Sequence, residues 1–331
     1  MHRHLAPRYC VAALVALLFP ALFALNGCDN PGEIEVLEAA LEPGQEAWLE
    51  DIGMPQVAQE IPTTVTAYDV DELCERIPLN VMRYELDVMA APQQVANMPG
   101  MVFVVDGAKR LTMYPDGTAT FVDQQHLGPN SPPIQPVPDV ELLDHGLALL
   151  DDMGALDDPY VTVQAANVVA NWAEPQGVGD ATLTHQTASF RQKVDHVPAF
   201  GPGARLEIVY PGDILPVAFN HSLRCLQPEQ TDATLSPAEA VIAWRIRIEN
   251  GGAWNVLDQD LETFASAEVF RIEMGHYIPS AGEAAPTIEP MYKISGVASG
   301  VGTGGAAADV PFLWYQPAIH GRPLPPAIQS L

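Results

Sequence analysis

Basic side chains are scarce in this sequence of 331 residues, which holds 15 lysines and arginines against 42 aspartates and glutamates. The resulting net charge of −27 argues against binding to nucleic acid and against adsorption on anionic lipid, because both of those surfaces are negative themselves. An acidic surface that recruits a basic partner or divalent cations is one interpretation of this charge, and plain solubility is the other.

Sequence motifs of the common catalytic and cofactor sites are missing as well. The chain has no G-x-S-x-G nucleophile elbow, and Pro311 follows the glycine run 300–305 too soon for the helix that a dinucleotide site requires. We therefore expect no catalytic residue, no cofactor and no metal. The alternative is a hydrolase or metal-binding protein that uses acids and the histidines of the second half, namely His185, His196, His221 and His276.

No hydrophobic run reaches the length of about 20 residues with which a helix spans a bilayer. A run of about 15 apolar residues, 11–25, follows a short basic start and is interrupted by Pro20, which is typical of a secretory signal core. The next residues complete the sequence Leu-Asn-Gly-Cys, which resembles the lipobox at which bacterial envelopes lipidate a cysteine and cleave just before it. We expect residues 1–27 to be a lipoprotein signal and Cys28 to carry the lipid. An ordinary cleaved signal and an uncleaved anchor are the alternatives.

Only four cysteines are present, and the expected signal divides them. Cys10 lies within the signal and Cys28 is the expected lipidation site, so Cys74 and Cys225 remain as an even pair in an oxidising compartment. A disulfide between these two residues would close a loop of about 150 residues and stabilise the fold by up to roughly 5 kcal/mol. Two separate buried thiols are the alternative, and the wide spacing does not suit a zinc site.

Helix-like and strand-like segments alternate after an acidic, proline-containing stretch at 28–62, which we expect to be a flexible tether. Residues 110–122 predict a hairpin that turns at Pro115-Asp116-Gly117, and 139–153 predict a helix because apolar residues recur at helical spacing. About 96 residues later the order recurs, with a hairpin over 205–219 and a helix whose capping box begins at Ser236. Residues 161–172 fit either a helix or a strand.

These patterns predict an α+β fold of two modules, each a curved antiparallel sheet of hairpins packed on a helix. The first module is expected at 63–156 and the second at 157–316, and a proline-rich tail follows at 317–331.

The segment Phe190–Gly201, with the strand 206–210 after it, resembles the propeptide modules of thermolysin- and fungalysin-type metallopeptidases and the related PepSY domains. The helix start Leu235–Ala240 also fits those modules, and the resemblance covers 182–243 well and 63–153 in outline. It implies a folding assistant or inhibitor when such a module is joined to a peptidase, and an envelope regulator when it stands alone. No H-E-x-x-H occurs in this chain, so the peptidase would be a separate protein, inhibited or chaperoned in trans.

Aromatic residues gather in the last third and offer one candidate partner-binding surface at Phe312, Trp314 and Tyr315. Aromatics are overrepresented at interface hot spots, although core packing of a sheet also explains them. We therefore expect a non-catalytic protein of the bacterial cell envelope, held to a membrane by a lipid and regulating or binding an envelope protein, with a peptidase as one candidate. Strand addition at a sheet edge, or blocking of a partner's cleft, would be its mechanism. The choice between inner and outer membrane stays open.

Overall fold

The computed structural model describes residues 56–57, 60–71, 77–127, 133–173, 181–249, 261–283, 285–302, 305–322 and 324. They hold 16 strands and three helices, so the fold is mostly β. The helices are α2 (Leu79–Glu85), α3 (Asp139–Asp152) and α4 (Pro237–Glu249). The strands are β1 (Gln56–Val57), β2 (Thr64–Val70), β3 (Gln93–Gln94), β4 (Val102–Asp106), β5 (Lys109–Met113), β6 (Ala119–Asp123), β7 (Val161–Ala173), β8 (Thr182–Val194), β9 (Val197–Phe200), β10 (Arg205–Tyr210), β11 (Ala218–His221), β12 (Leu226–Ala233), β13 (Leu261–Tyr277), β14 (Thr287–Ile288), β15 (Pro290–Gly302) and β16 (Ala307–Pro317).

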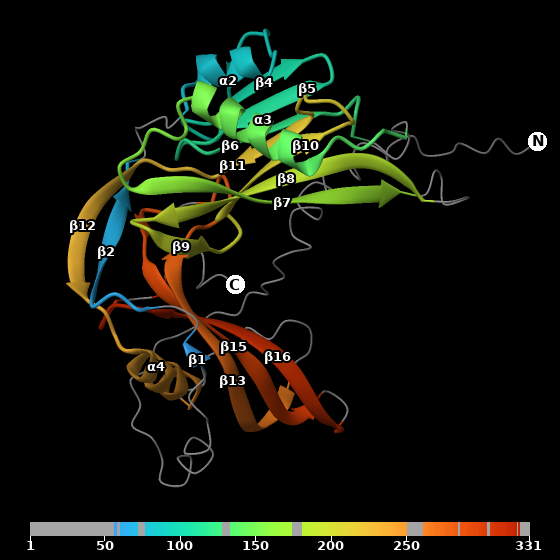
Figure 1. Ribbon diagram of the computed structural model, residues 1–331. Coiled ribbons are helices and arrows are strands. Elements are labelled where there is room, and N and C mark those ends of the chain that lie inside the picture. Colours follow the sequence, from blue (N-terminus) through green and yellow to red (C-terminus); the bar gives the residue numbers. More distant parts are fainter. Residues whose placement is uncertain are drawn as a thin grey trace, which may run out of the picture.

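Thirteen of these strands form one sheet in the order β16-β15-β13-β9-β8-β10-β11-β6-β5-β4-β3, with β1 beside β13 and β7 beside β8 (Figure 1). The other three form a second sheet in the order β12-β2-β14. Because β6 pairs with β11, the large sheet continues past position 156, where the sequence suggested a boundary. The predicted α+β fold of two modules, each packed on its own helix, is therefore wrong. The predicted hairpins join through pairings between distant segments, which local sequence patterns do not encode.

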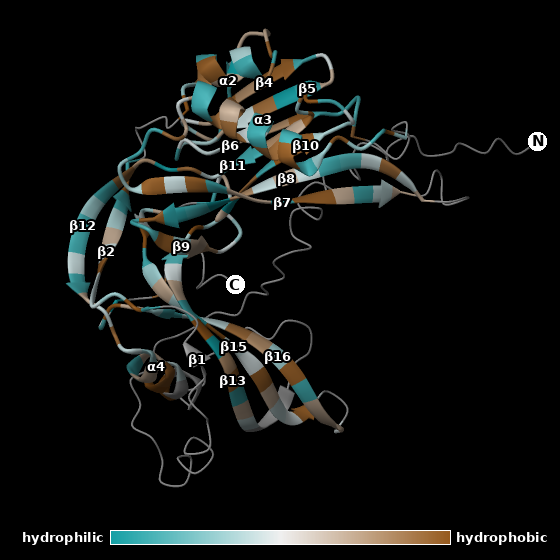
Figure 2. Cartoon of the chain, viewed as in Figure 1, coloured by the Kyte–Doolittle hydropathy of each residue, from teal (hydrophilic) through white to brown (hydrophobic). Residues whose placement is uncertain are grey.

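Two main hydrophobic cores lie on different parts of the sheet. The first packs Met82 of α2 and Leu142 of α3 with strand residues such as Phe190, and the second packs Trp244 of α4 against Phe312. Apolar and polar residues alternate along several strands, as Figure 2 shows, because successive side chains point to opposite faces. α2 and α3 therefore cover one apolar part of the sheet, and α4 covers another.

Two local features predicted from the sequence, a hairpin and a helix cap, are present in the structure. The hairpin predicted over 110–122 is β5 and β6, and Gly117 in its turn has a φ of 79°, which glycine adopts without strain. At the start of α4, Ser236 N donates to Glu239 Oε2 at 2.7 Å and Glu239 N donates to Ser236 Oγ at 3.2 Å, which is the predicted capping box. None of the helices in the described ranges is long and apolar enough to cross a membrane.

Candidate functional site

Among the described residues, Arg224 in the connection between β11 and β12 is a buried side chain with many hydrogen bonds. Its Nη2 donates to Asp116 Oδ2 at 2.8 Å and its Nε donates to the same oxygen at 3.1 Å. The guanidinium group also donates hydrogen bonds to the backbone carbonyls of Pro279, Ser280 and Glu283 at 2.9–3.1 Å. Every guanidinium nitrogen is thus occupied by the protein itself. This cluster joins the β5–β6 turn to the loop after β13 and has a structural role.

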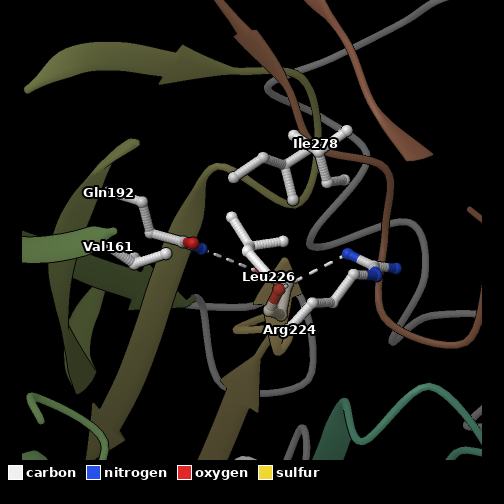
Figure 3. A pocket seen from close by; sticks show the side chains of 7 residues that line it. Val161, Gln192, Arg224, Leu226 and Ile278 are labelled. Atoms are coloured by element: carbon white, nitrogen blue, oxygen red, sulfur yellow. Dashed lines mark hydrogen bonds between the residues drawn. The ribbon is translucent and has the colours of Figure 1, made fainter. Parts of the chain in front are cut away.

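A small cavity lies beside this cluster, with space for about one water molecule. Figure 3 shows its lining, in which Gln192 Nε2 donates to the hydroxyl of Ser222 at 3.1 Å. Gln192 also donates to the Gly203 carbonyl at 2.8 Å, so its amide is committed within the protein. A cavity of this size does not accommodate a substrate or a cofactor. Its lining residues are Val161, Gln192, Ser222, Arg224, Leu226, Ile278 and Ile288.

Cys225, one of the two cysteines of the predicted disulfide, follows Arg224 directly in the chain. Asp71 N donates to the Cys225 carbonyl at 3.0 Å, and Cys74 follows Asp71 by three residues in the sequence. Cys74 itself lies outside the described residues, as does the predicted lipidation site Cys28. The pairing of Cys74 with Cys225 therefore stays a prediction.

The four histidines of the second half occupy separate environments. His276 on β13 is fully buried, its Nε2 bonds the Thr66 carbonyl at 2.9 Å, and its Nδ1 has no hydrogen-bond partner among the described residues. His185 on β8 bonds its neighbour Thr184, and burial lowers the pKa of His185. His196 forms the β8–β9 turn with a φ of 66°, and His221 is buried on β11. Within the described residues, no group of three histidines, cysteines or acids is arranged to hold a metal ion.

One carboxyl group has unusual properties for a sheet surface. Glu207 on β10 stands between Ser189 of β8 and Asn220 of β11 in the strand register, and burial raises its pKa, an effect that Arg205 partly opposes. A raised pKa is one mark of a general acid. Acid–base catalysis also requires a reacting partner, and no hydrogen bond between Glu207 and a histidine or second carboxyl is found in the described part. We therefore assign it no catalytic role.

The aromatic residues predicted as a partner surface lie inside the protein. Phe312 and Trp314 are 2% exposed within the core under α4, and Tyr315 is 4% exposed and stacks on Phe200 with ring centroids 5.4 Å apart. The core-packing interpretation of these three residues fits their burial, since side chains covered by their own chain offer no surface to a partner.

An accessible surface exists instead at β7, the edge strand beside β8 (Figure 1). Within the described ranges β7, a strand of 13 residues, pairs with β8 alone. Most of its side chains are exposed on both faces, including Val169 at 47% and Trp172 at 62%. Its sequence, VTVQAANVVANWA, contains no charged residue and no proline. One row of its main-chain donors and acceptors thus faces away from β8, and no side chain of β7 opposes an approaching strand by charge.

Two other edge strands carry the features with which proteins discourage strand addition. β12 contains Pro228, Glu229 and Asp232, and β16 contains Asp309 and Pro311 and has a mostly buried second half. Prolines and charges at an edge block a further strand, because proline lacks an N–H and charges resist desolvation. β7 has only two bulges, at Ala165–Asn167 and Asn171–Trp172, as protection. It is therefore the candidate binding site of the described structure.

One sequence feature could have indicated this site, namely the absence of charged residues over 161–173. The sequence of this stretch fits either a helix or a strand, because apolar residues such as valine and alanine occur in both kinds of element. The pairing with β8 shows that it is a strand.

Comparisons with known proteins assign no function. No protein-family profile matches the chain, and no curated protein is similar to it in sequence. One similar solved structure is an uncharacterized protein from Eubacterium rectale, with a sequence identity of 9% and a TM-score of 0.42. The similarity covers 78% of this chain and 86% of that protein. The chain is therefore placed in no family.

Proposed function

We propose that this chain is a lipid-anchored protein of the bacterial cell envelope that binds another protein without catalysing a reaction, by accepting an extended segment of it at β7. The observation that carries the proposal is the long, exposed and uncharged edge of this strand. The outward main-chain groups of such an edge pair with any extended segment, and hydrogen bonds to backbone supply the affinity.

The anchoring part of the proposal rests on the sequence. Residues 1–27 and Cys28 have the pattern of a lipoprotein signal, and 28–62 have the composition of a tether. A lipid at Cys28 would hold the protein at the membrane surface, where a partner in the same compartment meets it at high effective concentration. Peptidase inhibition in trans is a narrower form of the proposal, and the identity of the partner decides it.

The experiment is site-specific photocrosslinking in intact cells. A photoreactive amino acid replaces Val169 on β7, and in a matched control it replaces Ala233 on β12, which is also an exposed apolar residue on an edge strand. We expect a discrete adduct with one protein from position 169 and none from position 233. Absence of an adduct at 169, or the same adducts from both positions, would overturn the proposal. A peptidase in the adduct would support the inhibitor form.

A further inference from the structure

We infer that the segment accepted by β7 is basic as well as extended, with apolar and lysine or arginine side chains on the face that meets α3; this inference rests on the proposed function. The argument concerns the flank of α3 beside β7. Figure 1 shows α3 next to β8, and α3 packs against both β8 and β7. A strand added to β7 would therefore lie beside α3.

Helical geometry identifies the side chains on that flank. His145 Nδ1 bonds the hydroxyl of Tyr210 at 3.0 Å, so this flank of α3 faces β10. Successive residues turn by 100°, which places Leu143 and Leu147 on the opposite flank, toward β7 in the order β7-β8-β10. Both leucines are partly buried, and Val140 continues their stripe with 65% exposure. The edge of β7 is thus bordered by an apolar stripe that the protein leaves partly uncovered.

Two acidic residues border this stripe on its solvent side. Asp144 and Asp151 are exposed, and their spacing of seven residues places them two turns apart on the same side of α3. The helix contains three further acids and no lysine or arginine. Asp151 also sits in the last turn, where the helix dipole already disfavours negative charge. A basic side chain on an added strand would lay its methylene stem on Leu147 and bring its charge to these carboxylates.

The charge of the whole molecule favours the same partner. A net charge of −27 attracts a basic segment and repels an acidic one, while β7 itself contributes no charge. Main-chain pairing at β7 then gives affinity, and the acidic border of α3 selects among extended segments. The expected partner is therefore an extended segment whose side chains alternate between two faces, with apolar and basic residues on one of them.

The test measures binding of labelled peptides to the purified full chain by fluorescence anisotropy. The probe is a peptide of about nine residues, the length of a long strand. Threonine occupies every second position, and valine and lysine occupy the positions between. We expect the lysine probe to bind at least about tenfold more tightly than a glutamate version, and less tightly as salt rises. A central proline in the probe should abolish binding, because it removes a main-chain donor.

A matched pair of double variants separates position from charge. Asp144→Asn with Asp151→Asn should weaken the lysine probe about fivefold, as expected for exposed charge pairs. Glu141→Gln with Asp152→Asn removes the same charge from the flank toward β10 and should leave binding within about twofold. Equal loss in both double variants, or no preference for lysine over glutamate, would overturn the inference. Tight binding of an uncharged threonine–valine probe would overturn it while leaving strand addition standing, and failure of every probe together with an empty crosslink at Val169 would overturn both proposals.

Discussion

Asp116 and Arg224 stand 108 residues apart in the chain, and their carboxylate and guanidinium meet at 2.8 Å in the protein interior. Asp116 Oδ1 also accepts hydrogen bonds from the backbone N and the hydroxyl of Thr118, at 3.1 and 2.7 Å. The side chain of Arg224 is 1% exposed. A buried pair with its hydrogen bonds satisfied holds three distant segments in one arrangement, and losing one partner leaves the other charge uncompensated.

Arg224→Met should therefore lower the free energy of unfolding by about 3–5 kcal/mol. The pair of Arg271 and Glu273, at 2.6 Å, provides the control, because Arg271 is exposed and surface ion pairs contribute at most about 1 kcal/mol. Urea denaturation of the two variants, Arg224→Met and Arg271→Met, measures the difference. Equal and small effects would show that the Arg224 cluster does not hold the fold together.

The buried His276 should make stability depend on pH. Burial lowers the pKa of His276 to about 4, against 6.5 for an accessible histidine, although the Thr66 carbonyl and Asp195 oppose the shift. The unfolded chain therefore binds a proton at this site at higher pH than the folded one. The resulting stability is fully present above pH 6.5 and is lost as the pH falls from 6.5 toward 4, by about 3 kcal/mol in all.

His276→Gln should flatten that part of the profile, since glutamine does not titrate and retains a donor for Thr66. Unfolding free energies of both proteins between pH 4 and pH 8 give the comparison, with other titrating groups common to both. A parallel profile for the two proteins would remove His276 as the cause.

The disulfide prediction has a direct chemical readout. Peptide mapping of the non-reduced protein should recover Cys74 and Cys225 in one linked peptide, because Asp71 already bonds the Cys225 backbone. Cys225→Ser should then lower the free energy of unfolding by about 2–5 kcal/mol under oxidising conditions. Alkylation of both thiols without prior reduction would refute the bridge.

Membrane attachment is predicted to depend on one residue. Cys28→Ser should release the protein from the membrane fraction and prevent incorporation of labelled fatty acid, because the thiol is the site of lipid attachment. Cell fractionation with immunodetection measures the change. A variant that stays membrane-bound would contradict lipid anchoring at this position.

Several secondary-structure elements could be predicted from local sequence patterns. The predicted hairpin over 205–219 corresponds to β10 and β11, and α3 begins at Asp139 as expected. Each of these signals depends on neighbours within a few residues, such as side-chain alternation or the capping residues at Ser236. Elements of that kind need no knowledge of the fold.

The features that were not predicted depend on contacts between residues that are far apart in the sequence. The pairing of Phe121 on β6 with Phe219 on β11 merges the two expected modules, and no pattern near either residue announces it. The burial of Trp314 follows from its place in a sheet covered by α4, while Trp172 of similar character is exposed on β7. The exposed edge, and with it the candidate site, becomes visible only when the partners of every strand are known.

Amide hydrogen exchange of β7, residue by residue, tests strand addition most directly. The protein is measured alone and with the partner recovered by crosslinking at Val169. Strand addition predicts that alternate amides of β7, those facing away from β8, exchange at least about tenfold more slowly in the complex. The amides bonded to β8 should change little. Unaltered exchange along β7, with protection elsewhere on the surface, would contradict the proposal that β7 accepts a strand.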